Sequence, residues 1–184
     1  MDHSALVTPH HLLSLTLVLA MPLAGAGCGE SSRPDGGSGL LEVGAAAPEL
    51  STTAHDGTAL ELTKLGKPAI VYFYPADGTP GCTKEACAFR DIWTEYEAAQ
   101  VMVIGVSTQD EDSHESFASE HELPFPLVAD TDKTWATAFG VGVRAGYSQR
   151  VSFLLDSEGK IAKVYPGVDP GVHAAEVLAD AKAL

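Results

Sequence analysis

The sequence predicts an α/β fold, in which one mixed β-sheet is flanked by helices. Two patterns carry this expectation. The runs at residues 69–74 and 101–107 are rich in β-branched and aromatic residues, and a helical pattern over 83–98 lies between them. Further along, apolar runs at 151–156 and 161–165 are separated by a short turn, which is typical of a β-hairpin. The first pattern is that of a parallel βαβ unit with a right-handed crossover.

Length and composition fit one domain with accessory segments. The chain has 184 residues, of which 45% are hydrophobic, and this is enough to form a core. We place the domain at residues 40–184, because the composition before residue 40 is different. The sequence contains no internal repeat and no sign of a second domain.

The domain is predicted to start with a short strand at 47–53 and a turn at 55–58, where an Asp-Gly pair favours reversal of the chain. Residues 59–65 fit either a strand or a single helical turn. The helix over 83–98 is expected to pack one face against the sheet, because apolar side chains recur at helical spacing. That face carries Ala86, Phe89, Arg90, Trp93 and Tyr96.

The second half of the domain is predicted to alternate helices with strands. Pro126 cannot donate to a β-ladder, so its strand is expected at the edge of the sheet. Gly140 is expected to end the helix before it. In order, the elements are a helix at 113–121, a strand at 125–129, a helix at 133–139, the two hairpin strands, and a closing helix at 172–182. A βαβ unit followed by a helix, a hairpin and a helix is the layout of a thioredoxin-like fold.

The formal charge of −14 excludes two classes of partner. Nucleic acid binding needs a basic surface that neutralises phosphates, and the same is true of electrostatic docking on anionic lipid. The seven histidines have no spacing typical of a metal site. His114 and His121, which share one predicted helix, are expected at the surface.

The first 27 residues resemble a bacterial lipoprotein signal peptide. Residues 12–21 are apolar but too few to span a bilayer, and small residues at 24–27 precede Cys28. The pattern departs from such signals in two ways, because Gly25 stands where Leu is usual and no Lys or Arg precedes the apolar run. Cleavage before Cys28 would leave this cysteine to be lipidated. The alternative is an ordinary cleaved signal, with Cys28 as a spare thiol.

Residues 28–39 are predicted to be a flexible tether, since the stretch 30–39 is polar and rich in Gly and Ser. Signal and tether together indicate an exported protein that is anchored to a bacterial membrane and faces the periplasm or the exterior. Contact with the membrane is expected through the N-terminal lipid anchor only.

Cys82 is the candidate reactive residue. It follows Thr79-Pro80-Gly81 at a predicted strand–loop–helix junction, where backbone N–H groups and the helix dipole stabilise a thiolate. The alternative reading is an inert thiol in the core. Arg150 is expected to have a partner, because an arginine is seldom found in the middle of an apolar strand without one, and the alternative is a mere surface charge. Arg90 and Arg144 are the other candidates for the positive charge beside the reactive cysteine. Arg90 is instead expected to form an ion pair on the helix face, and Arg144 lies in a Gly-rich loop.

The segment Pro75-x-x-x-Thr79-x-x-Cys82 resembles the active-site motif of the peroxiredoxins. The longer string TPGCTKEACAFRD at 79–91 is similar to the peroxiredoxin Q, or bacterioferritin-comigratory-protein, subfamily of these AhpC/TSA-like proteins. The resemblance continues through VIGVS at 103–107, the stretch 113–130 and RVSFLLD at 150–156. It implies a thiol-dependent peroxidase that reduces hydrogen peroxide and organic hydroperoxides in antioxidant defence and needs no cofactor.

The resemblance also implies a role for each residue of the motif. Cys82 would be the peroxidatic thiolate, which becomes a sulfenic acid. Thr79 would orient thiolate and peroxide, and Pro75 would shield the site. Arg150 would stabilise the thiolate and the charge on the leaving oxygen. Glu85 occupies the place of an acid that holds the arginine, although an exposed Glu in the first turn needs no such role.

Cys87 would be the resolving cysteine, which forms an intramolecular disulfide with Cys82. In an ideal helix two Cα atoms five residues apart are about 8.7 Å from each other. A disulfide requires about 7 Å or less. The helix is therefore expected to unwind locally after Cys82 is oxidised. The alternative is a one-cysteine enzyme in which Cys87 is a buried helix residue.

The family further implies recycling by a thioredoxin-like reductant, outside the cytoplasm if the chain is exported, and a monomer. Two other classes compete with the peroxidase. A membrane-anchored thiol-exchange or copper-delivery protein would usually carry Cys-x-x-Cys or Cys-x-x-x-Cys and, for copper, a distal histidine. Here the spacing is Cys-x₄-Cys, and the late histidine, His173, lies on the closing helix. A catalytically silent scaffold would not need Pro75, Thr79, Cys82 and Arg150 together.

Overall fold

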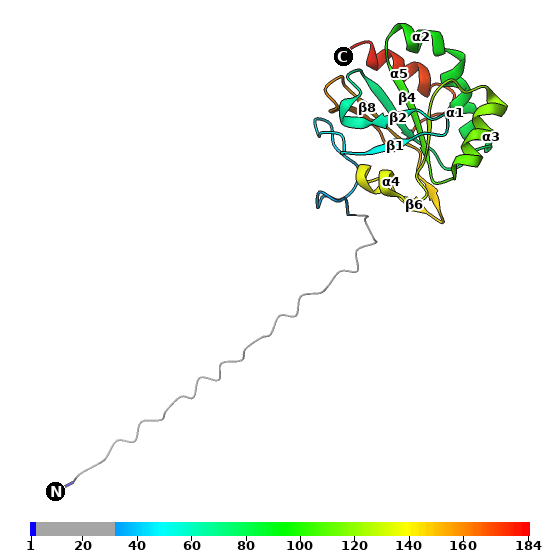
Figure 1. Ribbon diagram of the computed structural model, residues 1–184. Coiled ribbons are helices and arrows are strands. Elements are labelled where there is room, and N and C mark those ends of the chain that lie inside the picture. Colours follow the sequence, from blue (N-terminus) through cyan, green and yellow to red (C-terminus); the bar gives the residue numbers. More distant parts are fainter. Residues whose placement is uncertain (3–31) are drawn as a thin grey trace.

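A computed structural model describes residues 1–2 and 32–184. Its centre is a five-stranded mixed sheet with the strand order β5-β4-β3-β8-β9 (Figure 1). Strand β3 is parallel to β4, and β4 is parallel to β5, whereas β8 runs antiparallel to both β3 and β9. The strands are β3 (Ala69–Phe73), β4 (Met102–Ser107), β5 (Leu127–Ala129), β8 (Val151–Leu155) and β9 (Ile161–Tyr165).

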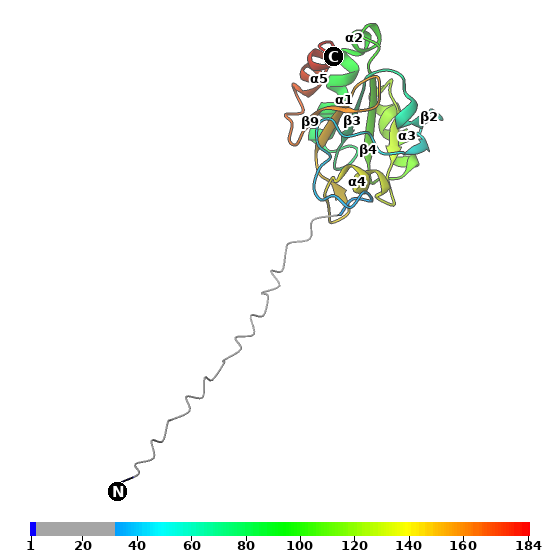
Figure 2. The same ribbon diagram turned by 90° about the vertical axis from the view of Figure 1, so that its left-hand side faces the viewer.

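Helices cover both faces of the sheet. On one face the core is formed by α1, α3 and α5 with side chains such as Tyr72 and Phe89. On the other face α4 packs with Phe73 and Phe153. Helices α1 and α5 lie next to each other, as the turned view shows (Figure 2). Their bounds are α1 (Pro80–Asp91), α3 (Glu111–His121), α4 (Thr134–Phe139) and α5 (His173–Ala181).

Two small antiparallel ribbons complete the domain. The first joins β1 (Ser51–Thr53) to β2 (Ala59–Glu61), and it runs directly into a 3₁₀ turn at Leu62–Lys64. Both readings of residues 59–65 are therefore present, one after the other. The second ribbon, β6 (Val143–Arg144) with β7 (Tyr147–Ser148), was not predicted.

The predicted α/β, thioredoxin-like architecture is confirmed. The strand that follows Pro126 lies at the edge of the sheet, and Gly140 ends α4 with a φ of 71°. One helix prediction was too long, because the helix over 83–98 is divided at Ile92. This residue has φ −114° and ψ 24°, which ends α1 and begins α2 (Trp93–Ala98). The helix also begins earlier than expected, at Pro80.

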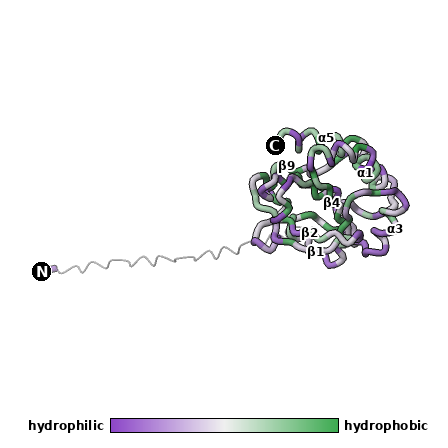
Figure 3. The backbone as a smooth tube through the Cα atoms, turned by 45° about the horizontal axis from the view of Figure 1, so that its top comes forward, coloured by the Kyte–Doolittle hydropathy of each residue, from purple (hydrophilic) through white to green (hydrophobic). Residues whose placement is uncertain are grey.

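Hydrophobic side chains follow the strands, as the sheet arrangement requires. Tyr72 and Phe73 alternate between the two faces, and both are at most 1% exposed. In Figure 3 the tube is most hydrophobic along the strands at the centre and more hydrophilic around the outside. This two-layered core fixes the end of β3, from which the loop to α1 leaves.

Apart from residues 1–2, the predicted signal at 1–27 lies outside the described part of the chain, and so does Cys28. The tether at 28–39 is described from Ser32 on. There Ser32 pairs with Ser38, and the Arg33 guanidinium donates to the Gly39 and Leu40 carbonyls at 2.8 and 3.0 Å. Its role as a tether stays a prediction. Within the described residues no helix combines the length and apolar character that crossing a membrane requires.

Candidate active site

Cys82 lies at the third position of α1, directly after the loop that leaves β3. Thr79 is the N-cap, and the first backbone hydrogen bond of the helix runs from the Thr83 N–H to the Thr79 carbonyl at 2.9 Å. The N–H groups of Gly81 and Cys82 thus precede the hydrogen-bonded part of the helix, where they are oriented toward an incoming anion or oxygen. Cys82 itself is only 2% exposed and packs among core residues.

Arg150 contacts the cysteine sulfur. It stands one residue before β8, and its Nη2 donates to Cys82 Sγ at 3.2 Å. Its Nη1 donates to Glu85 Oε2 in a short ion pair. The guanidinium fork therefore joins the thiol to a carboxylate on the same helix, a geometry that a lysine could not reproduce. Cys82 and Arg150, which the resemblance assigns to one site, are therefore in contact.

The alternative of an exposed Glu in the first helical turn is wrong, because α1 begins at Pro80 and Glu85 lies in its second turn, where it is not exposed. Its side chain is fully buried, because it points inward along α1 toward Arg150. Burial raises the pKa of the Glu85 carboxyl from 4.5 to about 7, and the charge and hydrogen bond of Arg150 oppose this rise. The structure thus places Glu85 where it can hold the guanidinium.

His173 is a buried neighbour of this pair. Its Nε2 lies 2.9 Å from Ser152 Oγ and 3.9 Å from Glu85 Oε1. Burial, together with the charge of Arg150, lowers the pKa of His173 to about 4, so the ring is neutral at pH 7. A neutral ring adds no second positive charge beside Arg150.

Thr79 and Pro75 lie on the loop before the helix. The Thr79 hydroxyl donates to the Ala76 carbonyl at 3.0 Å, which leaves its lone pairs able to accept a hydrogen bond. Thr79 is exposed, and Pro75 is half-buried. Both lie on the loop that joins β3 to the start of α1, where Cys82 stands.

Cys82 and Cys87 both lie within α1 and both are free thiols. Cys87 is half-buried. Because the helix is continuous from Pro80 to Asp91, the separation of about 8.7 Å expected for an ideal helix applies to the two Cα atoms. In this conformation the two sulfurs cannot bond.

Among the described residues, the hydrogen bonds place Arg150, and neither competing arginine, at the sulfur of Cys82. Arg90 forms an ion pair with Asp91 at 2.7 Å, as predicted, and also donates to the His121 carbonyl at 2.8 Å. Arg144 is exposed in the β6–β7 ribbon. Neither contact involves the sulfur of Cys82, whereas that of Arg150 does.

The expectation that the histidines lie at the surface was wrong for His114, which is fully buried in α3, and His173 is also fully buried. A pattern in the sequence could have indicated this. His114 shares a helix face with Phe117 and Ala118, and His173 shares one with Val177, all of which are buried. Asp77, which pairs with His114, was also not predicted.

Comparison with known proteins fits this geometry. The sequence model described as the AhpC/TSA family matches residues 43–164. A Coxiella burnetii protein named for the peroxiredoxin Bcp is 44% identical over 146 residues, which cover 75% of this chain and 97% of that one. The chain belongs to the AhpC/TSA family.

Solved structures of the AhpC/TSA family have the same fold. The peroxidoxin BcpB of Mycobacterium tuberculosis matches with a TM-score of 0.72 and 31% identity, over 78% of this chain and 98% of that one. The bacterioferritin comigratory protein of Xanthomonas campestris, studied for alkyl peroxide reduction, matches with a TM-score of 0.70 and 34% identity over 79% and 98%. The predicted peroxiredoxin Q resemblance and thiol peroxidase class are confirmed.

Proposed function

We propose that Cys82 is the peroxidatic residue of this thiol peroxidase and that Arg150, Thr79, Pro75 and Glu85 assist it. The observation that carries the proposal is the hydrogen bond from Arg150 Nη2 to Cys82 Sγ at 3.2 Å. A guanidinium donor on the sulfur stabilises the thiolate, which is the nucleophilic form. The start of α1 adds oriented N–H groups on the same side.

In the first step the thiolate attacks the terminal oxygen of the hydroperoxide. The S–O bond forms as the O–O bond breaks, so that sulfur is oxidised to the sulfenic acid and the other oxygen leaves as an alkoxide or hydroxide. That oxygen then takes a proton from water. Arg150 stabilises the charge on the leaving oxygen, and the Thr79 hydroxyl accepts a hydrogen bond from the peroxide. Pro75 has no N–H that could compete for the peroxide.

Glu85 holds the arginine in place. The pair between Glu85 and Arg150 spans α1 and the start of β8, so the guanidinium keeps its direction while the sulfur changes charge. Because Glu85 is fully buried, this contact is shielded from competing water.

Cys87 acts as the resolving residue. Its thiol attacks the sulfenic sulfur, and the disulfide forms as water leaves. The two Cα atoms are too far apart in the intact helix, so the first part of α1 unwinds in each turnover. A dithiol reductant of the thioredoxin type then restores both thiols by exchange.

Substrates are hydrogen peroxide and organic hydroperoxides, and the chain acts as a monomer. The N-terminal sequence supports export, with Cys28 lipidated, residues 28–39 as the tether, and the domain outside the cytoplasm. The reductant would then be an extracytoplasmic thioredoxin-like protein. Mass spectrometry of the mature N-terminus tests the location, because an unprocessed Met1 would contradict it.

Peroxide consumption by purified protein with a dithiol tests the chemistry. Cys82→Ser is expected to abolish activity, whereas Cys87→Ser retains the first turnover and loses recycling by a thioredoxin-type protein. Full activity of Cys82→Ser would refute the central assignment. If Cys87→Ser is recycled as well as the wild type, the assignment of Cys82 stands, but the enzyme uses a one-cysteine mechanism.

A further inference from the structure

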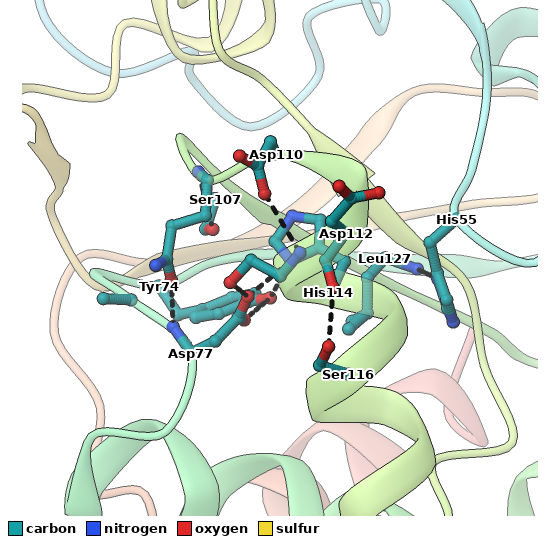
Figure 4. A network of polar contacts seen from close by, with 12 residues as sticks. His55, Tyr74, Asp77, Ser107, Asp110, Asp112, His114, Ser116 and Leu127 are labelled. Carbon is teal, nitrogen blue, oxygen red and sulfur yellow. Dashed lines mark hydrogen bonds and ion pairs between the residues drawn. The ribbon is translucent and has the colours of Figure 1, made fainter.

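A second buried acid–base contact lies on the loop that carries Thr79. Asp77 Oδ2 is 2.8 Å from His114 Nδ1, and the two side chains are 7% and 0% exposed. Tyr74 and Ser113 also donate to the Asp77 carboxylate, at 2.8 and 2.7 Å. Figure 4 shows Asp77 on the loop directed toward His114 on α3. We call Tyr74, Asp77, Ser113 and His114 the Asp77 cluster.

The hydrogen-bond partners hold both His114 and Asp77 in place. His114 Nε2 lies 3.2 Å from the Val128 carbonyl of β5, and Nδ1 lies 2.8 Å from the Asp77 carboxylate. Burial favours the neutral carboxyl, but hydrogen bonds from His114, Ser113 and Tyr74 hold the pKa of Asp77 below its usual value. The N-terminus of α3, where Ser113 and His114 lie, also favours the negative charge.

The cluster fastens a loop that has few other attachments. The Tyr74 N–H still bonds to Val106 of the sheet, and the Asp77 N–H donates to the Gln109 side chain in a short contact. Immediately after Asp77, Gly78 has a φ of 67°, a left-handed conformation that glycine adopts without strain, and it turns the chain toward α1. Thr79 and the first turn of α1 follow. Their direction therefore depends on where Asp77 is held.

Stability alone does not account for such a pair. A buried ion pair gains little over well-packed apolar side chains of similar volume, because desolvation offsets most of the attraction. This pair lies on the loop that leads to Cys82. The chain before the sulfur is thus held by Asp77 with His114, and the sulfur itself is contacted by Arg150, which pairs with Glu85.

We propose that the Asp77–His114 contact positions residues 74–79 for the reaction with peroxide, which makes Asp77 and His114 positioning residues for Thr79 and the first turn of α1. This inference rests on the proposed role of Cys82. It also assigns a fixed point to the unwinding step, because Asp77 stays attached to α3 while the chain beyond Gly78 unwinds.

The test compares oxidation with alkylation of Cys82 in the full-length chain. Oxidation by hydrogen peroxide is followed by stopped flow, and alkylation by iodoacetamide is followed by mass spectrometry of the Cys82 peptide. Asp77→Asn and His114→Gln are each expected to slow oxidation by about 10- to 100-fold. Alkylation is expected to change far less, since it needs the thiolate but not the oriented loop. A double variant with Asp77→Asn and His114→Gln should oxidise about as slowly as either single variant, because both changes break the same contact.

Asp180→Asn is the matched control. Asp180 also accepts from a tyrosine and a cation, Tyr165 and Lys163, both at 2.6 Å, but it lies on α5 away from the loop. Its variant should oxidise at the wild-type rate. Ser113→Ala, which removes one hydrogen bond to Asp77, should have a smaller effect than Asp77→Asn and keeps the test possible if Asp77→Asn does not fold.

Three results would overturn the inference: wild-type oxidation rates in the folded variants of the pair, an equal loss of oxidation and alkylation, or an equal loss in Asp180→Asn. Circular dichroism and thermal melting establish that each variant is folded. A wild-type chain whose Cys82 does not react with peroxide would instead refute the proposed function, so the two failures are distinguishable.

Discussion

Gly81→Ala is a change in which helix stability and catalysis respond in opposite directions. Gly81 lies in the first turn of α1, immediately before Cys82, and its φ is not in the left-handed region. Alanine is therefore compatible with the backbone. A Cβ at this position would meet Arg150 Nη2 at 3.2 Å and Pro170 Cγ at 4.0 Å. The first contact is tight, so the guanidinium has to shift by a few tenths of an ångström.

The structure sets the size of both effects. Replacing glycine by alanine in a helix stabilises it by about 0.5–1 kcal/mol, because the unfolded chain has less freedom to lose. The same free energy opposes unwinding, and it corresponds to a roughly two- to fivefold slower formation of the disulfide. Oxidation of Cys82 is also expected to slow, by less than tenfold, since Arg150 is displaced but keeps Glu85. The melting temperature should not fall.

Stopped-flow fluorescence measures both steps, with Trp93 close to α1 as the reporter. Gly167→Ala is the control, because Gly167 also has an ordinary φ and a Cβ there would meet nothing within 4 Å. It should leave both phases unchanged. A Gly81→Ala chain that forms its disulfide as fast as wild type, with an unchanged or higher melting temperature, would refute the claim that α1 unwinds in each turnover.

Two further predictions concern the buried pair next to Cys82. Arg150→Lys is expected to lower the rate constant for oxidation by about 100-fold, because the ammonium cannot donate to Cys82 and Glu85 as a fork does; peroxide competition assays measure it. Glu85→Gln and His173→Gln are expected to change the pH dependence of stability with opposite signs, as measured by urea unfolding between pH 4 and 7. Parallel pH profiles in these two variants would contradict the assigned shifts.

The opposite signs follow from the two pKa values. Between pH 4.5 and about 7 the folded state keeps the Glu85 proton that the unfolded chain has released, so this group lowers the free energy of unfolding as pH rises. Between about pH 4 and 6.5 the unfolded chain binds a proton that folded His173 does not. This group therefore raises the free energy of unfolding as pH rises. Each slope is at most about 1.4 kcal/mol per pH unit. Relative to wild type, Glu85→Gln should therefore gain stability with rising pH, and His173→Gln should lose it.

Much of the fold could be predicted because local signals agreed with it. Pro126 placed its strand at an edge, and Gly140 placed the end of α4, each through a backbone property of one residue. The break at Ile92 has no such signal, since the helical pattern continues through it and no Gly or Pro stands there. The β6–β7 ribbon consists of two-residue strands, which are too short for an alternating pattern to be recognised.

The site was predictable in part for a similar reason. The motif around Cys82 is local, so its residues could be found in one stretch of sequence. The buried state of Glu85 could not, because carboxylates are usually exposed and its partner Arg150 is 65 residues away. The burial of His114 could be indicated by the apolar helix face it shares, but its partner Asp77, 37 residues away, could not be found from the sequence. Both pairs depend on contacts between α1 and β8, or between α3 and the loop, which only the folded chain brings together.

The position of Glu85 between the two cysteines limits how far α1 can unwind. Unwinding beyond Glu85 would separate it from Arg150 and remove the contact that holds the guanidinium, a cost that unwinding of the first residues alone avoids. Unwinding of residues 80–84 frees Cys82 and keeps that pair. In an α-helix the carbonyls of 80–84 accept from the N–H groups of 84–88, so these amides should lose protection from hydrogen exchange in the disulfide form. Amides of 89–91 should keep theirs. Loss of protection throughout α1 and α2 would contradict this limit, and unchanged protection at 84–88 would contradict unwinding itself.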